Sequence, residues 1–404
     1  MDLYPTRLRR TALLQQWGNV PIMAGTSAVN VGSIMLWMPI LALILRDLGA
    51  TDLQVSIGVA AWTAGGAVGQ YVGGIWTDRF GRFPIAVYPL YAAALALAFA
   101  ARMTSWMPFL AAYVIYSTLS GLQHPVFPAV IGESVSSKLR GRAFGTVHLF
   151  IATATIIGPL VGGQLVPRLG GQNVMLITAA IWLIAGAARH RFLKETRPRG
   201  TTLAPFAFAS ILKGRLLKVT LISGAFQIIL NLTMWGPFLA LHANDYLHLS
   251  RYQINTYYAI GACATAAVSP LAGRTVERFG AYRTLAVSCL LLGLSAIMWS
   301  LQGSITGIIA GYILMGVSFQ FAIISMDTFR IVALDEGIRA RALGAAGTIS
   351  MIASALMMPA AGYLKEVAGS LSPFIMALAF SCVLFVAVMG LHRSGDEVAV
   401  RHPH

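Results

Sequence analysis

Two carboxylates lie inside long apolar stretches of the sequence, Glu133 and Asp327. Charged groups are costly in such surroundings and usually serve a function. Arg330 follows Asp327 by three residues, so the two side chains can meet on one face of a helix. Asp327 could therefore take up and release a proton, or it could form a permanent structural ion pair with Arg330. Glu133 is a second candidate for the proton and His124 a third, because an imidazole changes its charge near neutral pH.

The stretches that hold these residues predict helices that span a membrane. Of the 404 residues, 57% are hydrophobic and 11% are charged, against about 25% charged in an average soluble domain. A spanning helix needs about 20 mostly apolar residues, and no segment between the stretches is polar and long enough to fold as a soluble domain. We predict an all-α membrane protein with twelve transmembrane helices. The expected spans are residues 20–45, 54–76, 84–103, 107–134, 143–167, 173–192, 217–243, 253–273, 284–302, 305–333, 343–364 and 373–391.

The formal charge of +15 raises the question of a nucleic-acid partner, but the positions of the basic residues indicate membrane topology instead. If the N-terminus is cytoplasmic, 23 of the 29 Lys and Arg residues fall on the cytoplasmic side and five on the opposite side, with Arg330 inside a span. Cytoplasmic loops of membrane proteins carry an excess of Lys and Arg. Both termini, with Arg7, Arg9 and Arg10 near the start, are therefore predicted to be cytoplasmic.

The sequence also repeats itself. The segment GIWTDRFG, which begins at Gly74, recurs as GRTVERFG from Gly273, and the acid, Arg, Phe and Gly match at an offset of 199 residues. The residues WMP at Trp37 recur as WGP at Trp235, at an offset of 198. Repeats of this kind build transporters whose solute site lies near mid-membrane. We predict two six-helix halves, residues 1–192 and 217–404, joined by a cytoplasmic linker at 193–216.

These segments resemble the signature motifs of the major facilitator superfamily, and the resemblance extends over essentially the whole chain. The motif after the second helix of that family reads G-x-x-x-D-R-x-G-R, and the second copy here has Glu277 in place of the Asp. A Glu-x6-Arg pattern at the end of helix four also matches. The resemblance implies a gating role for these residues, whereas arginines that only set topology are the alternative. The implied gating residues are Gly74, Asp78, Arg79, Gly81, Arg82, Glu133, Arg140, Glu277, Arg278 and Gly280.

The fifth span carries Gly158 and Pro159, which resemble a motif associated with antiporters of the same family. The match favours export and adds both residues to the implied gating set, although ordinary packing of small residues would give the same pattern. Two features depart from the drug exporters of the family. Ser117 stands where those proteins often have an arginine in helix four, and the first span contains no carboxylate.

In the family, helices one, four, seven and ten line the central cavity, and the matching spans here carry polar residues at helical spacing. Span four has Tyr113, Ser117, Ser120 and His124 at positions i, i+4, i+7 and i+11. Amides, an imidazole and indole rings suit a solute with both apolar and hydrogen-bonding surface. Hydrogen bonding between helices is the alternative role of any single amide. The predicted substrate-binding residues are Asn30, Trp37, Tyr113, Ser117, Ser120, Gln123, His124, Gln227, Asn231, Trp235, Gln320 and Arg330.

The sequence thus predicts a proton-coupled secondary active transporter that moves a small amphipathic solute across the bacterial inner membrane by alternating access, with export favoured over uptake. The alternatives are an uptake symporter for a small organic anion held by Arg330 and a transport-inactive sensor on the same scaffold. The sequence has no nucleotide-binding loop, nucleophile–base motif or metal-ligand spacing, so we expect no direct ATP drive, enzyme activity, cofactor or metal. The expected partners are a small-molecule substrate, protons and membrane lipid, with no nucleic acid, and the protein is expected to be a monomer.

Overall fold

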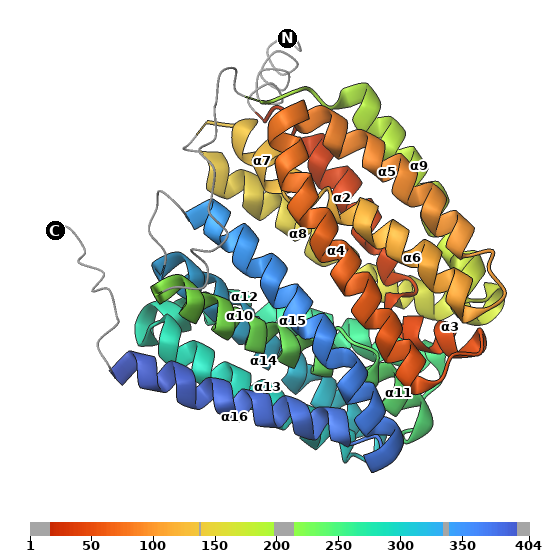
Figure 1. Cartoon of the computed structure of the whole chain (residues 1–404), viewed down its shortest axis with the longest axis vertical. Helices are drawn as coiled ribbons and strands as arrows, with labels where there is room; N and C mark the ends of the chain where they lie inside the picture. Colours follow the sequence, from red (N-terminus) through yellow and green to blue (C-terminus); the bar gives the residue numbers. More distant parts are fainter. Residues whose placement is uncertain (1–16, 137–138, 198–213, 334–338, 394–404) are drawn as a thin grey trace, which may run out of the picture. The chain divides into compact units, whose positions relative to one another are not determined.

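The computed structural model describes residues 17–136, 139–197, 214–333 and 339–393, and these residues form helices without any strand (Figure 1). Nine of the described helical segments are long and apolar enough to cross a membrane. The other three predicted spans are helical too, within α4, α6–α7 and α12, which confirms the predicted all-α fold with twelve helices. The described elements are α2 (Val20–Met35), η1 (Met38–Ile40), α3 (Leu41–Asp47), α4 (Asp52–Phe80), α5 (Arg82–Ala100), α6 (Trp106–Gly121), α7 (Val126–Glu133), α8 (Arg140–Leu169), α9 (Gly171–Phe192), α10 (Gly214–Thr233), α11 (Phe238–Asp245), α12 (Arg251–Phe279), α13 (Ala281–Ser300), α14 (Ile305–Ala333), α15 (Arg339–Ala368) and α16 (Ser372–Arg393).

The first compact unit consists of Met1–Met38 and Val68–Leu203. Helix α2 packs on α8 and α9 in this unit, and α5 packs on α6 and α9. Apolar side chains of α2, α5, α7 and α8 form a common core, in which Met23, Val87 and Val147 are at most 1% exposed. Close packing of these faces brings polar residues of several helices within reach of one another.

Proline residues interrupt three of the predicted spans. Pro39 follows the end of α2, Pro125 directly precedes α7, and Pro237 directly precedes α11. Proline lacks the amide hydrogen of a helical bond and disfavours the helical conformation in the residue before it. Each of these spans is therefore two shorter helices rather than one. The repeated sequences at Trp37 and Trp235 mark the same interruption in the two halves of the chain.

Glycines allow helices of the first unit to approach each other closely. A Cβ atom added at Gly69 or Gly73 of α4 would collide with the backbone of the α6 segment, and one at Gly158 or Gly162 of α8 would collide with α2 or the residue after it. Pro159 is buried beside this contact. The antiporter-like Gly158-Pro159 motif thus lies where α8 packs against α2, and its gating role stays a prediction.

The second compact unit consists of Pro39–Ala67 and Ala204–His404. Helix α13 packs on α14 and α16, α10 packs on α15 and α16, and α12 packs on α14. Trp299 and Phe374 are fully buried in this unit, with ring centroids 5.8 Å apart. The predicted boundaries 1–192, 193–216 and 217–404 stay a prediction. Linker residues 198–213, Arg7, Arg9, Arg10 and both chain termini lie outside the described residues.

Candidate functional site

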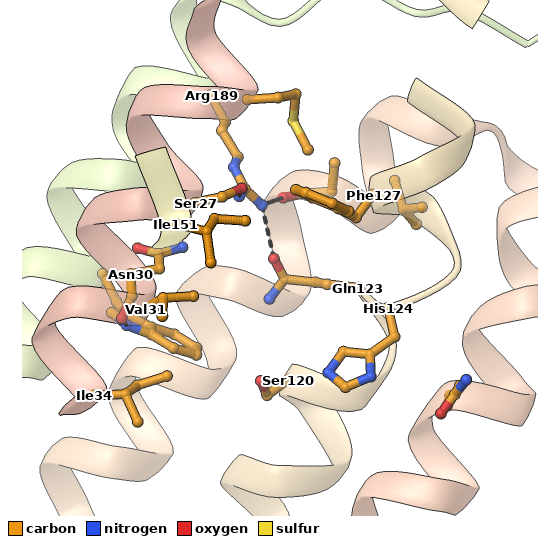
Figure 2. A pocket seen from close by; sticks show the side chains of 15 residues that line it. Ser27, Asn30, Val31, Ile34, Ser120, Gln123, His124, Phe127, Ile151 and Arg189 are labelled. Atoms are coloured by element: carbon orange, nitrogen blue, oxygen red, sulfur yellow. Dashed lines mark hydrogen bonds between the residues drawn. The ribbon is translucent and has the colours of Figure 1, made fainter. Parts of the chain in front are cut away.

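The first unit contains a pocket of about 460 Å³ (Figure 2). Most of its wall is apolar, and polar side chains enter it from α2, α4, α6 and α9 and from the turn between α6 and α7. An apolar pocket with a few converging polar groups is the usual form of a small-molecule site. Its lining residues are Met23, Ser27, Asn30, Val31, Ile34, Gln70, Ala86, Ser120, Gln123, His124, Val126, Phe127, Ile151, Trp182 and Arg189.

The interruption of α6 and α7 positions two of the predicted binding residues. Helix α6 ends at Gly121, and the amides of Gln123 and His124 bond to the carbonyls of Ser120 and Gly121, both at 3.1 Å. The two side chains then lie beside Ser120 in the pocket wall (Figure 2). Discontinuous membrane helices often form solute sites because their ends expose polar groups inside the membrane. Of the stripe predicted on one continuous helix, Ser120 therefore reaches the pocket from the end of α6 and His124 from the turn that follows it.

Arg189 of α9 is the pocket's buried cation, with 4% of its surface exposed. Its guanidinium donates to the hydroxyls of Thr26 at 2.9 Å and Ser27 at 3.2 Å, to Gln123 Oε1 at 2.8 Å and to the Ala86 carbonyl at 3.2 Å. All four acceptors are neutral. Figure 2 shows the side chain reaching from α9 toward Gln123.

The sequence does not identify Arg189 as a site residue, because a basic residue in the last turn of a predicted span matches the excess of Lys and Arg expected on the cytoplasmic side. One signal was available. Arg189 follows Trp182 by seven residues, which places both on one face of α9, and both line the pocket.

Of the predicted residues in the first unit, Asn30, Ser120, Gln123 and His124 line the pocket, whereas Trp37, Tyr113 and Ser117 do not. Trp37 is fully buried and donates from Nε1 to the Thr178 hydroxyl at 2.9 Å. The Tyr113 ring stacks on Phe109 with centroids 5.7 Å apart. Ser117 is half-buried.

The predicted binding residues of the second unit mostly contact neighbouring helices. Asn231 of α10 is buried and donates to the Ser354 hydroxyl of α15 at 2.7 Å, and that hydroxyl donates to the Gln227 carbonyl at 3.3 Å. Gln320 of α14 donates to the Ser269 hydroxyl of α12 at 3.0 Å. A fourth predicted residue, Trp235, is 40% exposed. Asn231 and Gln320 thus have the interhelical role that is the alternative to solute binding.

Asp327 and Arg330 meet on α14 as their spacing predicts. Arg330 Nη1 lies 3.5 Å from Asp327 Oδ1, and the two side chains are 23% and 65% exposed, respectively. Arg330 also donates from Nε to the Ser223 hydroxyl of α10 at 3.0 Å. The guanidinium thus has a neutral partner as well as the carboxylate.

Arg82 binds three acceptors at the junction of α4 and α5. It donates to Glu133 Oε1 at 2.9 Å, to Asp78 Oδ1 at 3.0 Å and to the Thr77 carbonyl at 3.0 Å. Arg140 does not accompany it, since its Nε donates to the Gly132 carbonyl at 3.0 Å. The predicted gating residues Arg82, Asp78 and Glu133 therefore form one group within the first unit.

Of the predicted gating residues in the two repeated loops, Arg79, Glu277 and Arg278 lie on the surface. Arg79 and Arg278 are exposed and lie over the rings that follow them, Phe80 at 5.4 Å and Phe279 at 5.2 Å. Glu277 is exposed as well, and Gly74 has open space around it. Gly81 and Gly280 have φ angles of 106° and 81°, which favour glycine, and this explains why both copies keep it before the next helix.

Glu195 covers the start of α5, and the sequence did not predict it. Its carboxylate accepts the backbone N–H groups of Arg82 at 2.9 Å and Phe83 at 3.0 Å. Burial acts to raise the pKa of Glu195, but the N–H donors of Arg197, Phe83, Arg82 and Thr196 together outweigh burial and lower it. The segment after α9 is thereby attached to the α4–α5 loop.

The second unit contains an ion network of two cations and two carboxylates, Arg46, Asp52, Asp245 and Lys365. Arg46 donates from Nε to Asp52 Oδ1 at 2.6 Å. Lys365, only 7% exposed, contacts Asp52 and lies 3.3 Å from Asp245 Oδ2. The network joins α3, the start of α4, the end of α11 and α15, and its charges balance.

Comparison with known proteins identifies the family. A model of the Major Facilitator Superfamily matches residues 23–235 and 221–402. The chain belongs to the major facilitator superfamily. The superfamily consists of transporters and not of enzymes, so the predicted family and class are confirmed, and the chain is a multi-pass membrane transporter.

Two curated relatives in the superfamily carry drug-resistance names. The chain is 28% identical over 153 residues to the multidrug resistance protein MdtL of Shewanella sp. (strain ANA-3), which covers 38% of this chain and 39% of that protein. It is 26% identical over 226 residues to the multi-drug resistance efflux pump PmrA of Streptococcus pneumoniae serotype 4, which covers 53% and 55%. The matches thus span between two fifths and just over half of these relatives.

Solved structures of the superfamily share the fold at low identity. The nucleoside transporter NupG is 16% identical with a TM-score of 0.75, over 93% of this chain and 99% of that one. The human organic anion transporter MFSD10 is 16% identical with a TM-score of 0.69, over 91% and 98%. At these identities the likeness concerns the fold alone.

Proposed function

We propose that the protein is a proton-coupled secondary active transporter that exports a small amphipathic solute across the bacterial inner membrane by alternating access. It acts as a monomer with both termini in the cytoplasm. The observation that carries this function is the pocket of the first unit, which combines an apolar wall with Asn30, Ser120, Gln123 and His124. A solute with one apolar side and one hydrogen-bonding side satisfies both kinds of surface.

Two observations support the export direction. The matched relatives bear the names multidrug resistance protein and multi-drug resistance efflux pump. The Gly158-Pro159 motif, which resembles that of antiporters, lies in the contact of α8 with α2. Accumulation of a solute in cells that is lost when the protein is deleted would contradict export.

Asp327 is the carboxylate we propose for the proton. Its side chain is 65% exposed and lies 3.5 Å from Arg330, and Arg330 keeps Ser223 as a partner if the carboxylate is neutralised. Glu133 is less suited, because it is held by Arg82 and also accepts from the Thr196 hydroxyl at 2.8 Å. Removing the charge of Glu133 would leave Arg82 without its closest carboxylate.

Transport by the purified full chain in liposomes tests the proposal. A pH gradient is imposed, and cationic, neutral and anionic amphipathic compounds are supplied to the wild type, Asp327→Asn and the control Asp47→Asn, whose carboxylate is exposed and pairs with Arg251. We expect gradient-driven movement in the wild type and Asp47→Asn, and exchange without gradient drive in Asp327→Asn. If Asp327→Asn remains coupled, the pair with Arg330 is structural and His124 or Glu133 is the next candidate. Movement that ignores the gradient would refute proton coupling.

A further inference from the structure

We propose that the pocket of the first unit binds an organic anion and that the acidic group of this solute pairs with Arg189. The inference rests on the proposed transport function and narrows it to a class of substrate. The solute would carry a carboxylate, or a chemically similar anionic group, on an apolar body that fits a pocket of about 460 Å³.

The first argument is the unpaired charge of Arg189. Elsewhere in the described residues, the cations Arg46, Arg82, Arg330 and Lys365 all have a carboxylate partner. Arg189 is more deeply buried than the three arginines, yet its described partners are two hydroxyls, an amide oxygen and a backbone carbonyl. A buried cation without an anion bears a large desolvation cost, which a bound carboxylate would offset.

The second argument is the composition of the pocket around this charge. None of its lining residues is an Asp or Glu, so nothing in the wall would repel an anion or compete with it for Arg189. The guanidinium presents five N–H donors in a planar fork, and four hydrogen bonds to described residues leave one donor for a ligand. Gln123 and Ser27, which hold the guanidinium, both line the pocket, so exchange of one of these bonds would free a second donor.

A third observation concerns Asn30, which lies one helical turn along α2 from Ser27 and lines the same pocket. Asn30 Oδ1 is buried and has no hydrogen-bond partner among the described residues. A buried acceptor without a donor is costly, and a hydroxyl or amino group on the solute would supply one. In Figure 2 Asn30 lies beside Val31 and Ile34, away from His124 and Ser120. The pocket therefore favours an acid whose apolar body carries a hydrogen-bond donor.

The competing explanation is that Arg189 only fastens α2, α5 and the α6–α7 turn together. That role predicts binding that does not depend on the charge of the ligand. Three probes of nearly equal shape separate the two explanations: 2-naphthoate, its neutral methyl ester and 2-naphthylmethylammonium. Their dissociation constants are measured by calorimetry on the purified full chain in detergent, for the wild type, Arg189→Gln, Arg189→Lys and Arg191→Gln.

We expect the wild type to bind 2-naphthoate about 30-fold more tightly than the methyl ester, since truncating one partner of a buried charge pair has at least that effect. In Arg189→Gln the preference falls below about threefold. Arg189→Lys keeps the preference at reduced affinity, because the charge stays and the fork is lost. Arg191 is exposed two residues further along α9, and Arg191→Gln should behave as the wild type.

The inference is overturned if the wild type does not bind 2-naphthoate, if it prefers the ester or the ammonium compound, or if Arg189→Gln keeps the anion preference. If Arg189→Gln does not fold, Arg189→Lys and Ser120→Phe decide the question, because filling the pocket at Ser120 should abolish naphthoate binding while the contacts of Arg189 remain. Gradient-driven transport of cations or neutral compounds alone would refute this inference and leave the proposed function intact. Naphthoate binding without transport of any compound would refute the proposed transport function and leave the assignment of the anion site intact.

Discussion

The two terminal nitrogens of Arg46 bind the two carboxylate oxygens of Asp245, at 2.5 Å and 2.8 Å, although 199 residues separate them in the sequence. Such a two-point contact between guanidinium and carboxylate is strong and directional. Asp52 and Lys365 complete the group, so that α3, α4, α11 and α15 meet at four charges. These helices cannot separate at this point without exposing or unpairing the charges.

Replacing Lys365 should destabilise the protein strongly. Lys365→Met leaves Asp52 and Asp245 to share Arg46, and the side chains of Lys365 and Asp52 are only 5% and 14% exposed. Breaking a buried ion pair by removing one partner costs about 3–5 kcal/mol. Arg251→Ala is the control, because its pair with Asp47 is 32% and 52% exposed and should contribute at most about 1 kcal/mol. Thermal unfolding of Lys365→Met and Arg251→Ala in detergent measures the two effects. Equal shifts of the melting temperature in the two variants would contradict the prediction.

Arg82 and Arg79 stand only three residues apart, but we expect their replacement to have unequal effects on the free energy of unfolding. Arg82 is 12% exposed at its side chain and binds Glu133 and Asp78, whereas Arg79 is exposed. We expect Arg82→Gln to reduce the free energy of unfolding by about 3 kcal/mol and Arg79→Gln to change it by less than about 0.5 kcal/mol. Denaturant titration of the two variants provides the comparison. A larger effect of Arg79→Gln would show that the exposed arginine carries the stability of this loop.

Glu195 should make the stability of the folded protein depend on pH, with its contribution lost in acid. Its pKa in the folded protein is lowered from 4.5, so its contribution is fully present above that value and is lost as the pH falls through the folded pKa. The melting temperature of the wild type should therefore exceed that of Glu195→Gln at neutral pH, and the difference should shrink below pH 4.5. A difference that stays constant over the titration would mean that the carboxylate does not act through the N–H groups at the start of α5.

A methyl group at Gly162 should disrupt the contact of α8 with α2. The added Cβ would collide with the backbone of Leu36, and such overpacking costs about 1–3 kcal/mol. Gly145 on the same helix has no atom within 4 Å of an added Cβ, so Gly145→Ala should be neutral or stabilise by about 1 kcal/mol through helix propensity. Unfolding temperatures of the two alanine variants test this, and a harmless Gly162→Ala would show that the helices can move apart.

Much of the fold could be predicted because membrane helices are long, apolar and repeated here. The matching residues at Trp37 and Trp235 even mark the two equivalent interruptions, although the sequence alone suggested continuous helices. The interruptions follow from proline chemistry at Pro39 and Pro237. His124 illustrates the consequence, since it reaches the pocket from a turn after Gly121 and not from the helical stripe that was expected.

The contacts of individual charges were less accessible to prediction. Arg189 stands in the last turn of α9, where a basic residue commonly interacts with the helix end or with water, and its direction depends on partners up to 163 residues away. Asp52 and Lys365 are separated by 313 residues and share no local pattern. Sequence spacing determines which residues share a helix face, but the packing of other helices decides which face becomes a pocket.

The position of Lys365 offers a way to follow the transport cycle by chemical labelling. An amine-acylating reagent modifies only lysines that it can reach, and the Lys365 side chain is 5% exposed between two carboxylates. Lys194 is exposed in the same chain and supplies an internal reference that reacts throughout. The ratio of the two labelled peptides in mass spectrometry would then report how often Lys365 becomes accessible. The measurement needs no substitution in the chain and can be repeated with any compound added to the bilayer.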